Sequence, residues 1–159
     1  MKTFLVSLLL IAGSIASAQE NPDKYIETLR QDLKTNKVAL ITEAMDLPDS
    51  VSAKFWPVYR EYDHELSKLG DRRVALVKEY AASFDAMTNE KAGSIMKSFF
   101  ANQQDRMALL KKYYSKVEKT LGAITAAKFV QVETQIQDLV DLQIGSQLPL
   151  MKKTVEGKK

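Results

Sequence analysis

The sequence predicts an all-α fold with four helices: a long, bent, antiparallel helical hairpin flanked by two shorter helices. The first observation behind this prediction is the spacing of apolar side chains. It alternates between three and four residues over residues 51–87 and again over 88–121, which places these side chains on one face of a helix. The second is the small number of turn residues, six Gly and four Pro in 159 residues, which favours helices over a β fold.

The composition suits one folded domain and excludes several classes of protein. Hydrophobic residues make up 45% and charged residues 27% of the chain, which allows a packed core and argues against global disorder. The net charge is +3 with both signs interspersed, which does not indicate a nucleic-acid-binding surface. There is no Cys, so disulfides, thiolate metal sites and Cys nucleophiles are excluded.

Residues 1–18 have the pattern of a secretory signal peptide. Lys2 precedes an apolar run over residues 4–15, and small residues lead to a cleavage site after Ala18. The run is shorter than the ~20 residues that a membrane-spanning helix needs, although a retained N-terminal anchor is the alternative. We therefore predict a periplasmic protein whose mature chain forms a single helical domain over residues 19–151.

The first helix is expected to begin at Asn21-Pro22-Asp23, which offers a capping side chain, a Pro at the first helical position and an acid near the positive end of the helix dipole. It should end near Ala44. Lys37 stands where the apolar stripe expects a hydrophobic residue. We therefore expect this helix to be the least tightly held.

The second helix follows Leu47-Pro48-Asp49 and is expected to span roughly 36 residues, about 54 Å. Pro57 lies inside it, so we expect a bend; a separate short helix that ends before Pro57 is the alternative. The two apolar rows of this helix are Phe55, Tyr62, Leu69 and Leu76, and Tyr59, Leu66, Arg73, Tyr80 and Met87.

The third helix is expected to be capped by Thr88 and to end at Gly122. Its predicted core-facing rows are Met96, Gln103, Leu110 and Val117, and Phe100, Met107, Tyr114 and Leu121.

Thr125 is expected to cap the fourth helix, which Gly145 and Pro149 would close. Residues 152–159 are polar and charged, and we predict that they form a disordered tail.

No group of residues indicates catalysis. Glu61 and His64 have the Glu-x-x-His spacing of helical di-iron sites, but His64 is the single His in the chain and one protomer lacks the further ligands. A surface His is the preferred interpretation, and a site shared across a dimer is the alternative. Neither a nucleophile elbow nor a Gly-rich phosphate loop occurs. We therefore expect a protein that is not an enzyme and that needs no metal or cofactor.

The third helix is apolar over an arc wider than one neighbouring helix can cover. The first and fourth helices could fill that gap, or part of the arc could be a dimer interface or a client-binding surface. Arg73 interrupts an apolar row, either as a long side chain that lies along its edge or as a cation on a binding surface. The candidate residues for binding a client or partner are Trp56, Arg72, Arg73, Phe99, Leu109 and Tyr113.

Several segments resemble the Spy/CpxP-like family of periplasmic helical proteins. Thr88 retains the Thr of the family's Leu-Thr-x-x-Gln helix start, whereas residues 47–51 depart from it. The similar segments are Leu47-Pro48 leading into residues 55–62, then Asp71-Arg72-Arg73, residues 87–92 and residues 127–133. The resemblance implies an antiparallel homodimer shaped as a shallow cradle.

The leading functional hypothesis is an ATP-independent, chaperone-like stress-response protein that binds unfolded clients. Apolar patches would hold exposed client segments, and nearby Lys and Arg would speed the encounter with acidic ones. The alternative is an adaptor that binds one folded envelope partner. A metal-responsive sensor is disfavoured because the His-rich segments of that branch are missing. We expect neither nucleic-acid binding nor a membrane span.

Overall fold

The computed structural model describes residues 22–151, and it is built from helices joined by short connections. The predicted signal peptide and the charged tail lie outside the described residues. In the described range there is no strand, which confirms the all-α class. The elements are α1 (Pro22–Met45), α2 (Asp49–Ser83), the short 3₁₀ helix η1 (Phe84–Ala86), α3 (Asn89–Leu121) and α4 (Ala123–Gln147).

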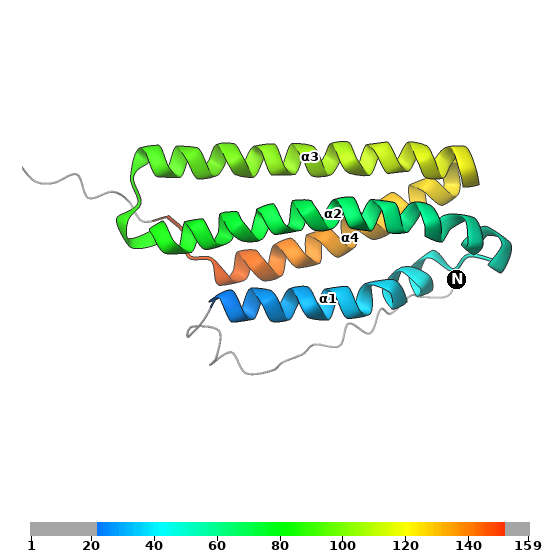
Figure 1. Ribbon diagram of the computed structural model, residues 1–159, viewed down its shortest axis with the longest axis horizontal. Helices are drawn as coiled ribbons and strands as arrows, with labels where there is room; N and C mark the ends of the chain where they lie inside the picture. Colours follow the sequence, from blue (N-terminus) through cyan, green and yellow to red (C-terminus); the bar gives the residue numbers. More distant parts are fainter. Residues whose placement is uncertain (1–21, 152–159) are drawn as a thin grey trace, which may run out of the picture.

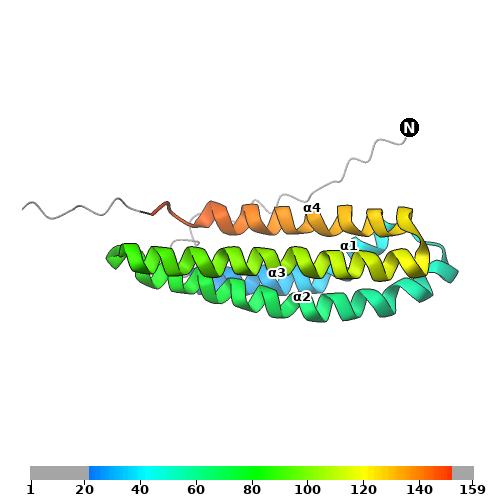
Figure 2. The ribbon, with the colours of Figure 1, turned by 90° about the horizontal axis from the view of Figure 1, so that it is seen from above.

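The helices form an elongated antiparallel bundle. Each long helix runs opposite to the one before it, with α1 and α3 at opposite edges of the view and α2 and α4 between them (Figure 1). Seen from above, α4 lies on the side of the bundle away from α2 (Figure 2). The closely packed helix pairs are α2–α3, α3–α4 and α1–α4. The predicted long hairpin is therefore α2–α3, and α1 packs more closely on α4 than on α2, its neighbour in the sequence.

Aromatic side chains fill the space between α2 and α4. Tyr62 lies closest to the centre, with its ring 5.1 Å from the ring of Phe129 on α4 and 5.4 Å from that of Tyr113 on α3. Phe55 and Tyr59 also meet Phe129, each at 6.3 Å between ring centroids. Because aromatic side chains bury large apolar areas, this cluster contributes much of the core packing at this end of the bundle.

The register of the α2–α3 hairpin is fixed by polar contacts on both sides of its apolar seam. Inside, the buried Asn102 side chain donates a hydrogen bond of 3.0 Å to the carbonyl oxygen of Leu69. Outside, ion pairs of 2.6–2.9 Å join the two helices, and we refer to them as the exposed seam. They are Glu61–Lys116, Glu65–Lys112, Arg72–Asp105 and Glu79–Lys91.

The second and third helices begin and end close to the predicted positions. The α2 helix runs through Pro57 without interruption, so the alternative of a separate short helix is wrong; α2 follows a gently curved path (Figure 2). Thr88 caps α3 as predicted, since its hydroxyl accepts from the backbone N–H of Lys91 at 3.1 Å. Gly122 ends α3 with φ +88°, a conformation that favours glycine.

Two of the predictions for the ends of α4, at Thr125 and Gly145, are wrong, whereas Pro149 directly follows the C-cap residue Leu148 as expected. Helix α4 begins at Ala123, directly after Gly122, so Thr125 lies inside its first turn instead of capping it. One residue thus ends α3 and starts α4. Gly145 lies within α4, which continues to Gln147.

The face that α3 turns towards the core differs from the predicted one. Phe100 and Met107, placed in a predicted core row, are 62% and 65% exposed, and Met96 is also exposed. The buried side chains at these levels are Ile95 and Leu109. The helix is apolar over a wide arc, so its periodicity alone does not define which side is covered.

Candidate functional site

A buried carboxylate occupies the middle of the bundle. Glu133 on α4 has no exposed surface, and its two oxygens accept hydrogen bonds from the hydroxyls of Tyr59 (2.7 Å) and Tyr62 (3.1 Å) on α2. A charge in such a position is costly unless hydrogen bonds and an opposite charge accompany it. The two Tyr side chains supply the hydrogen bonds, and the opposite charge comes from α1.

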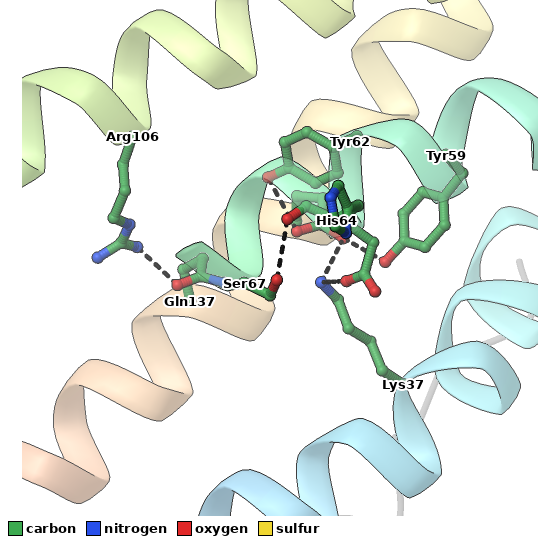
Figure 3. A network of polar contacts seen from close by, with 9 residues as sticks. Lys37, Tyr59, Tyr62, His64, Ser67, Arg106 and Gln137 are labelled. Atoms are coloured by element: carbon green, nitrogen blue, oxygen red, sulfur yellow. Dashed lines mark hydrogen bonds and ion pairs between the residues drawn. The ribbon is translucent and has the colours of Figure 1, made fainter. Parts of the chain in front are cut away.

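Lys37 on α1 provides this opposite charge. Its ammonium nitrogen lies 2.8 Å from Oδ1 of Asp63 and 3.5 Å from Oε1 of Glu133, and the side chain is almost completely buried (Figure 3). We call Lys37, Tyr59, Tyr62, Asp63 and Glu133 the buried network. It connects α1, α2 and α4, so the position of α1 depends on it.

The two Tyr side chains of the buried network are held in their neutral form. Burial, followed by the nearby Glu133 carboxylate, raises the pKa of Tyr59 and of Tyr62 well above the ordinary value of a phenol. A neutral phenol can donate to Glu133, whereas a phenolate would repel it. The network is therefore a fixed structural arrangement, and neither Tyr is prepared to act as a base.

A groove opens beside this network, between α3 and α4. It encloses about 240 Å³ and reaches down to Tyr62 and Leu66 on α2 and to Glu133. We call it the α3–α4 groove. Its walls are formed by Gln103, Arg106, Met107 and Leu110 from α3 and by Thr134, Gln137, Asp138 and Asp141 from α4.

The guanidinium group of Arg106 is already held by the walls of the groove. It donates to Oε1 of Gln137 at 2.8 Å and to Oε1 of Gln103 at 2.9 Å, and it lies 3.4 Å from Oδ2 of Asp141 (Figure 3 shows the contact with Gln137). Arg106 is occupied by these contacts, and Asp141 is paired with both Arg106 and Arg73, so the groove presents apolar side chains and the exposed carboxylate of Asp138 to a ligand. This combination suits a segment that carries apolar and basic side chains.

Exposed apolar residues extend the groove along both helices. On α3, Phe100 stands one helical turn from Gln103, and Met107 forms part of the wall. On α4, Leu142 stands one turn from Asp138 and is 69% exposed. Apolar side chains that gather beside a groove are typical of a surface that binds another protein.

The predicted binding residues do not gather at one place. Leu109 and Tyr113 are buried in the core of the protomer, with Tyr113 only 1% exposed, so the expectation that they form a binding surface does not fit. Trp56 is half-buried and packs edge-on against Tyr59, 5.4 Å between ring centroids.

The two predicted Arg residues are engaged in ion pairs. Arg72 is exposed and pairs with Asp105 at 2.9 Å. Arg73 is partly buried, lies 3.2 Å from Asp141 and stands over the ring of Phe99 at 5.9 Å. Burial lowers the pKa of Arg73, and Asp141 counteracts this shift. The structure thus brings Arg73 and Phe99 together, as it does Leu109 and Tyr113 in the core, and Arg73 is held by its contacts whereas Arg72 remains exposed.

Glu133 was not predicted as a central residue, although its position in the sequence contains a signal. Glu133 follows Phe129 by four residues and precedes Ile136 by three, which places it on the buried face of α4. Lys37 interrupts the apolar stripe of α1 in the same way. Two opposite charges that both interrupt apolar stripes are candidates for a buried pair.

The described part of the chain offers neither a metal site nor a membrane-spanning helix. In residues 22–151, His64 is exposed, and no cluster of His, Asp and Glu side chains could hold a metal ion. None of the helices in this range is both long and apolar enough to cross a membrane.

Comparisons with protein-family models, with curated proteins and with solved structures found no match for this chain.

Proposed function

We propose that this chain is a secreted, non-enzymatic, chaperone-like protein that binds unfolded clients in the α3–α4 groove. The observation that carries the proposal is the exposure of Phe100 and Met107 beside that groove. Both are large apolar side chains at helical spacing, and α4 leaves them uncovered. Burying them against a client removes apolar surface from water, which is favourable by roughly 25 cal/mol per Å².

The charge of the groove indicates which client segments it would accept. Asp138 on one wall is exposed, whereas Arg106 and Asp141 are paired with each other. A segment with apolar side chains next to Lys or Arg therefore complements the groove better than an acidic segment does. This differs from the acidic client segments expected from the sequence, which left open whether Arg73 lies along the edge of its apolar row or is a cation on a binding surface.

A periplasmic location forms part of the proposal. It is supported by the signal-peptide pattern of residues 1–18 and by the resemblance of several segments to the Spy/CpxP-like family. We expect the mature protein, isolated from the periplasm, to begin at Gln19. Mass spectrometry of its N-terminal peptide measures this directly, and an intact leader would contradict secretion.

The binding function is tested by aggregation of a chemically unfolded client after dilution. We expect the wild-type protein at equimolar dose to suppress light scattering and the double variant Phe100→Ser/Met107→Ser to lose most of that effect. The matched control is Ile124→Ser, because Ile124 is 89% exposed but lies at the start of α4, away from the groove. Wild-type protein that leaves scattering unchanged would contradict the proposal.

The adaptor hypothesis gives a different result in a co-purification experiment. A chaperone should retain many envelope proteins weakly, and the Phe100→Ser/Met107→Ser variant should retain fewer. One stoichiometric partner that is retained by the wild type and lost by the variant would favour the adaptor.

A further inference from the structure

The outward face of α4 is exposed along the helix and is almost free of charge. Figure 2 shows α4 at the edge of the bundle, on the side away from α2. Within Ala123–Gln147, every residue of which the structure describes, Asp138 is the one charged residue that is exposed. The outer surfaces of α2 and α3 carry the ion pairs of the exposed seam instead. A surface with so little charge can pack against another protein at a low cost of desolvation.

The residues of this face form a pattern that is symmetric about its middle. They are spaced alternately four and three residues apart, which places them on one side of the helix. In chain order they are Ile124, Lys128, Gln131, Gln135, Asp138 and Leu142, and we call them the α4 face. All are exposed except Lys128, which is half-buried. An apolar residue stands at each end, a charged residue follows it inwards with opposite signs at the two ends, and two amides lie in the middle.

Two copies of the α4 face match each other residue by residue when the helices pack antiparallel about a twofold axis. Ile124 of one copy then lies opposite Leu142 of the other, and Lys128 lies opposite Asp138. The two central Gln side chains also meet, and their amides can each donate and accept hydrogen bonds. Because a twofold axis repeats every contact, each of these pairs forms twice. A parallel arrangement would place like charges opposite each other.

The surroundings of these side chains in one protomer leave them available for such pairs. Ile124 is 89% exposed and Leu142 is 69% exposed, so each leaves most of its apolar surface in water. The ammonium group of Lys128 donates to the backbone oxygen of Met45 at 2.7 Å, and an ammonium group has two further N–H groups for a second acceptor. The apolar pairs would supply affinity, and the charged pairs would select the antiparallel register.

We propose that this chain forms an antiparallel homodimer in which the α4 faces of two copies pack against each other in this register. One helix from each copy gives a contact area at the small end of specific interfaces, so we expect the dimer to dissociate on dilution. Phe100 and Met107 lie outside the α4 face, so dimerisation is separate from client binding. Asp138 also lies on the wall of the α3–α4 groove, so a second copy and a basic client segment would compete for its carboxylate.

Cysteine cross-linking tests the register, since the chain has no Cys of its own. The double variant Ile124→Cys/Leu142→Cys carries its two thiols about 27 Å apart along one helix, too far for a disulfide within one copy. In the proposed dimer each thiol lies opposite the other one, so we expect mild oxidation to give a covalent dimer. Each single variant is the matched control and should stay monomeric, because identical positions of the two copies are also about 27 Å apart. A double variant that forms no more covalent dimer than the single variants would overturn the proposal.

An exchange of charge provides an independent measurement. Asp138→Lys places two Lys side chains opposite each other, and Lys128→Glu places Glu opposite Asp. We expect the dissociation constant of either homodimer, measured by sedimentation velocity, to rise roughly tenfold or more. A mixture of the two variants restores two attractive pairs and should form a heterodimer. The matched control is Asp105→Lys, which makes the same change of charge on α3 and should dimerise like the wild type.

Circular dichroism establishes that each charge variant is folded. If Lys128→Glu weakens the fold through its contact with Met45, the double variant Ile124→Cys/Leu142→Cys still decides the register. Wild-type protein that stays monomeric at every concentration tested would overturn the proposal, as would a mixture of folded charge variants that forms no heterodimer.

Discussion

The exposed seam between α2 and α3 and the buried network of α1, α2 and α4 both use charged side chains, in opposite surroundings. The residues of the exposed seam keep between 38% and 61% of their side-chain surface in water. In the buried network, Lys37 keeps 9% and Glu133 none. Water solvates the first group whether or not its ion pairs form. In the buried network, Lys37 and Glu133 depend on their protein partners, whereas Asp63 keeps 49% of its side-chain surface in water.

This difference separates two tasks that ion pairs perform in one bundle. Exposed pairs contribute about 0–1 kcal/mol each, so the exposed seam mainly favours one register of α2 against α3. Buried pairs add little compared with apolar residues of the same size, but removal of one partner leaves an uncompensated charge. The exposed seam should therefore tolerate substitution, and the buried network should not.

The largest predicted effect is the loss of Lys37 from the buried network, compared with the same Lys→Met substitution in the exposed seam. Lys37→Met should lower the free energy of unfolding by about 3–5 kcal/mol, because Glu133 then stays buried without a counter-charge. Lys112→Met in the exposed seam should cost less than about 1 kcal/mol, since Glu65 remains hydrated and still accepts from Tyr113. Urea unfolding followed by circular dichroism measures both, and equal effects would contradict the distinction.

An intermediate effect is predicted for alkaline pH. The pKa values of Tyr59 and Tyr62 are raised in the folded protein, so their stabilising contribution is complete below the ordinary phenol pKa and is lost as the pH rises above about 10. At about pH 11 the free energy of unfolding should be about 3 kcal/mol lower than at neutral pH. The reason is that Tyr59 and Tyr62 lose their phenol protons in the unfolded chain but keep them in the folded protein.

Ultraviolet absorbance of tyrosinate, recorded together with circular dichroism, tests this dependence. Tyr59 and Tyr62 should ionise only as the helices unfold, and Tyr62→Phe should reduce the steepness of the loss. If every Tyr ionised while the helical signal stayed constant, the phenols would not be protected as described.

The smallest predicted effect concerns a single pair of the exposed seam. A double-mutant cycle with Arg72→Ala and Asp105→Ala should give a coupling energy of about 0.2–1 kcal/mol, which decreases as salt is added. Both side chains are at least half exposed, and their nitrogen and oxygen lie 2.9 Å apart. A coupling that is insensitive to salt would show that the pair is shielded from solvent.

The long helices could be predicted from the sequence because their signals are local. The apolar spacing of residues 51–87, the capping Thr88 and the terminating Gly122 each act within one or two helical turns. The structure places α2 and α3 close to the predicted ends for this reason. The cap predicted at Thr125 is wrong because Gly122 starts α4 earlier and needs no capping side chain.

The covered faces could not be predicted from the same local signals. Met107 and Leu109 are both apolar, and only the packing of α3 against α2 and α4 leaves Met107 exposed and Leu109 buried. The buried network also results from tertiary packing rather than from local sequence signals. Lys37 and Glu133 are far apart in the sequence, and helix packing alone brings them within 3.5 Å. The groove beside them therefore depends on tertiary structure.

The connection between α3 and α4 consists of Gly122 alone, and this limits the insertions and deletions that the fold accepts at this point. Gly122 accepts from Ala126 N–H and donates to the carbonyl of Glu118, so the two helices meet without a spare residue. One inserted codon directly after Gly122 would turn every later position of α4 by about 100° about its axis, because a helix has 3.6 residues per turn. Glu133 would then leave its two phenol partners and Phe129 would leave the aromatic cluster. Natural variation in length should therefore avoid this joint even where individual side chains vary.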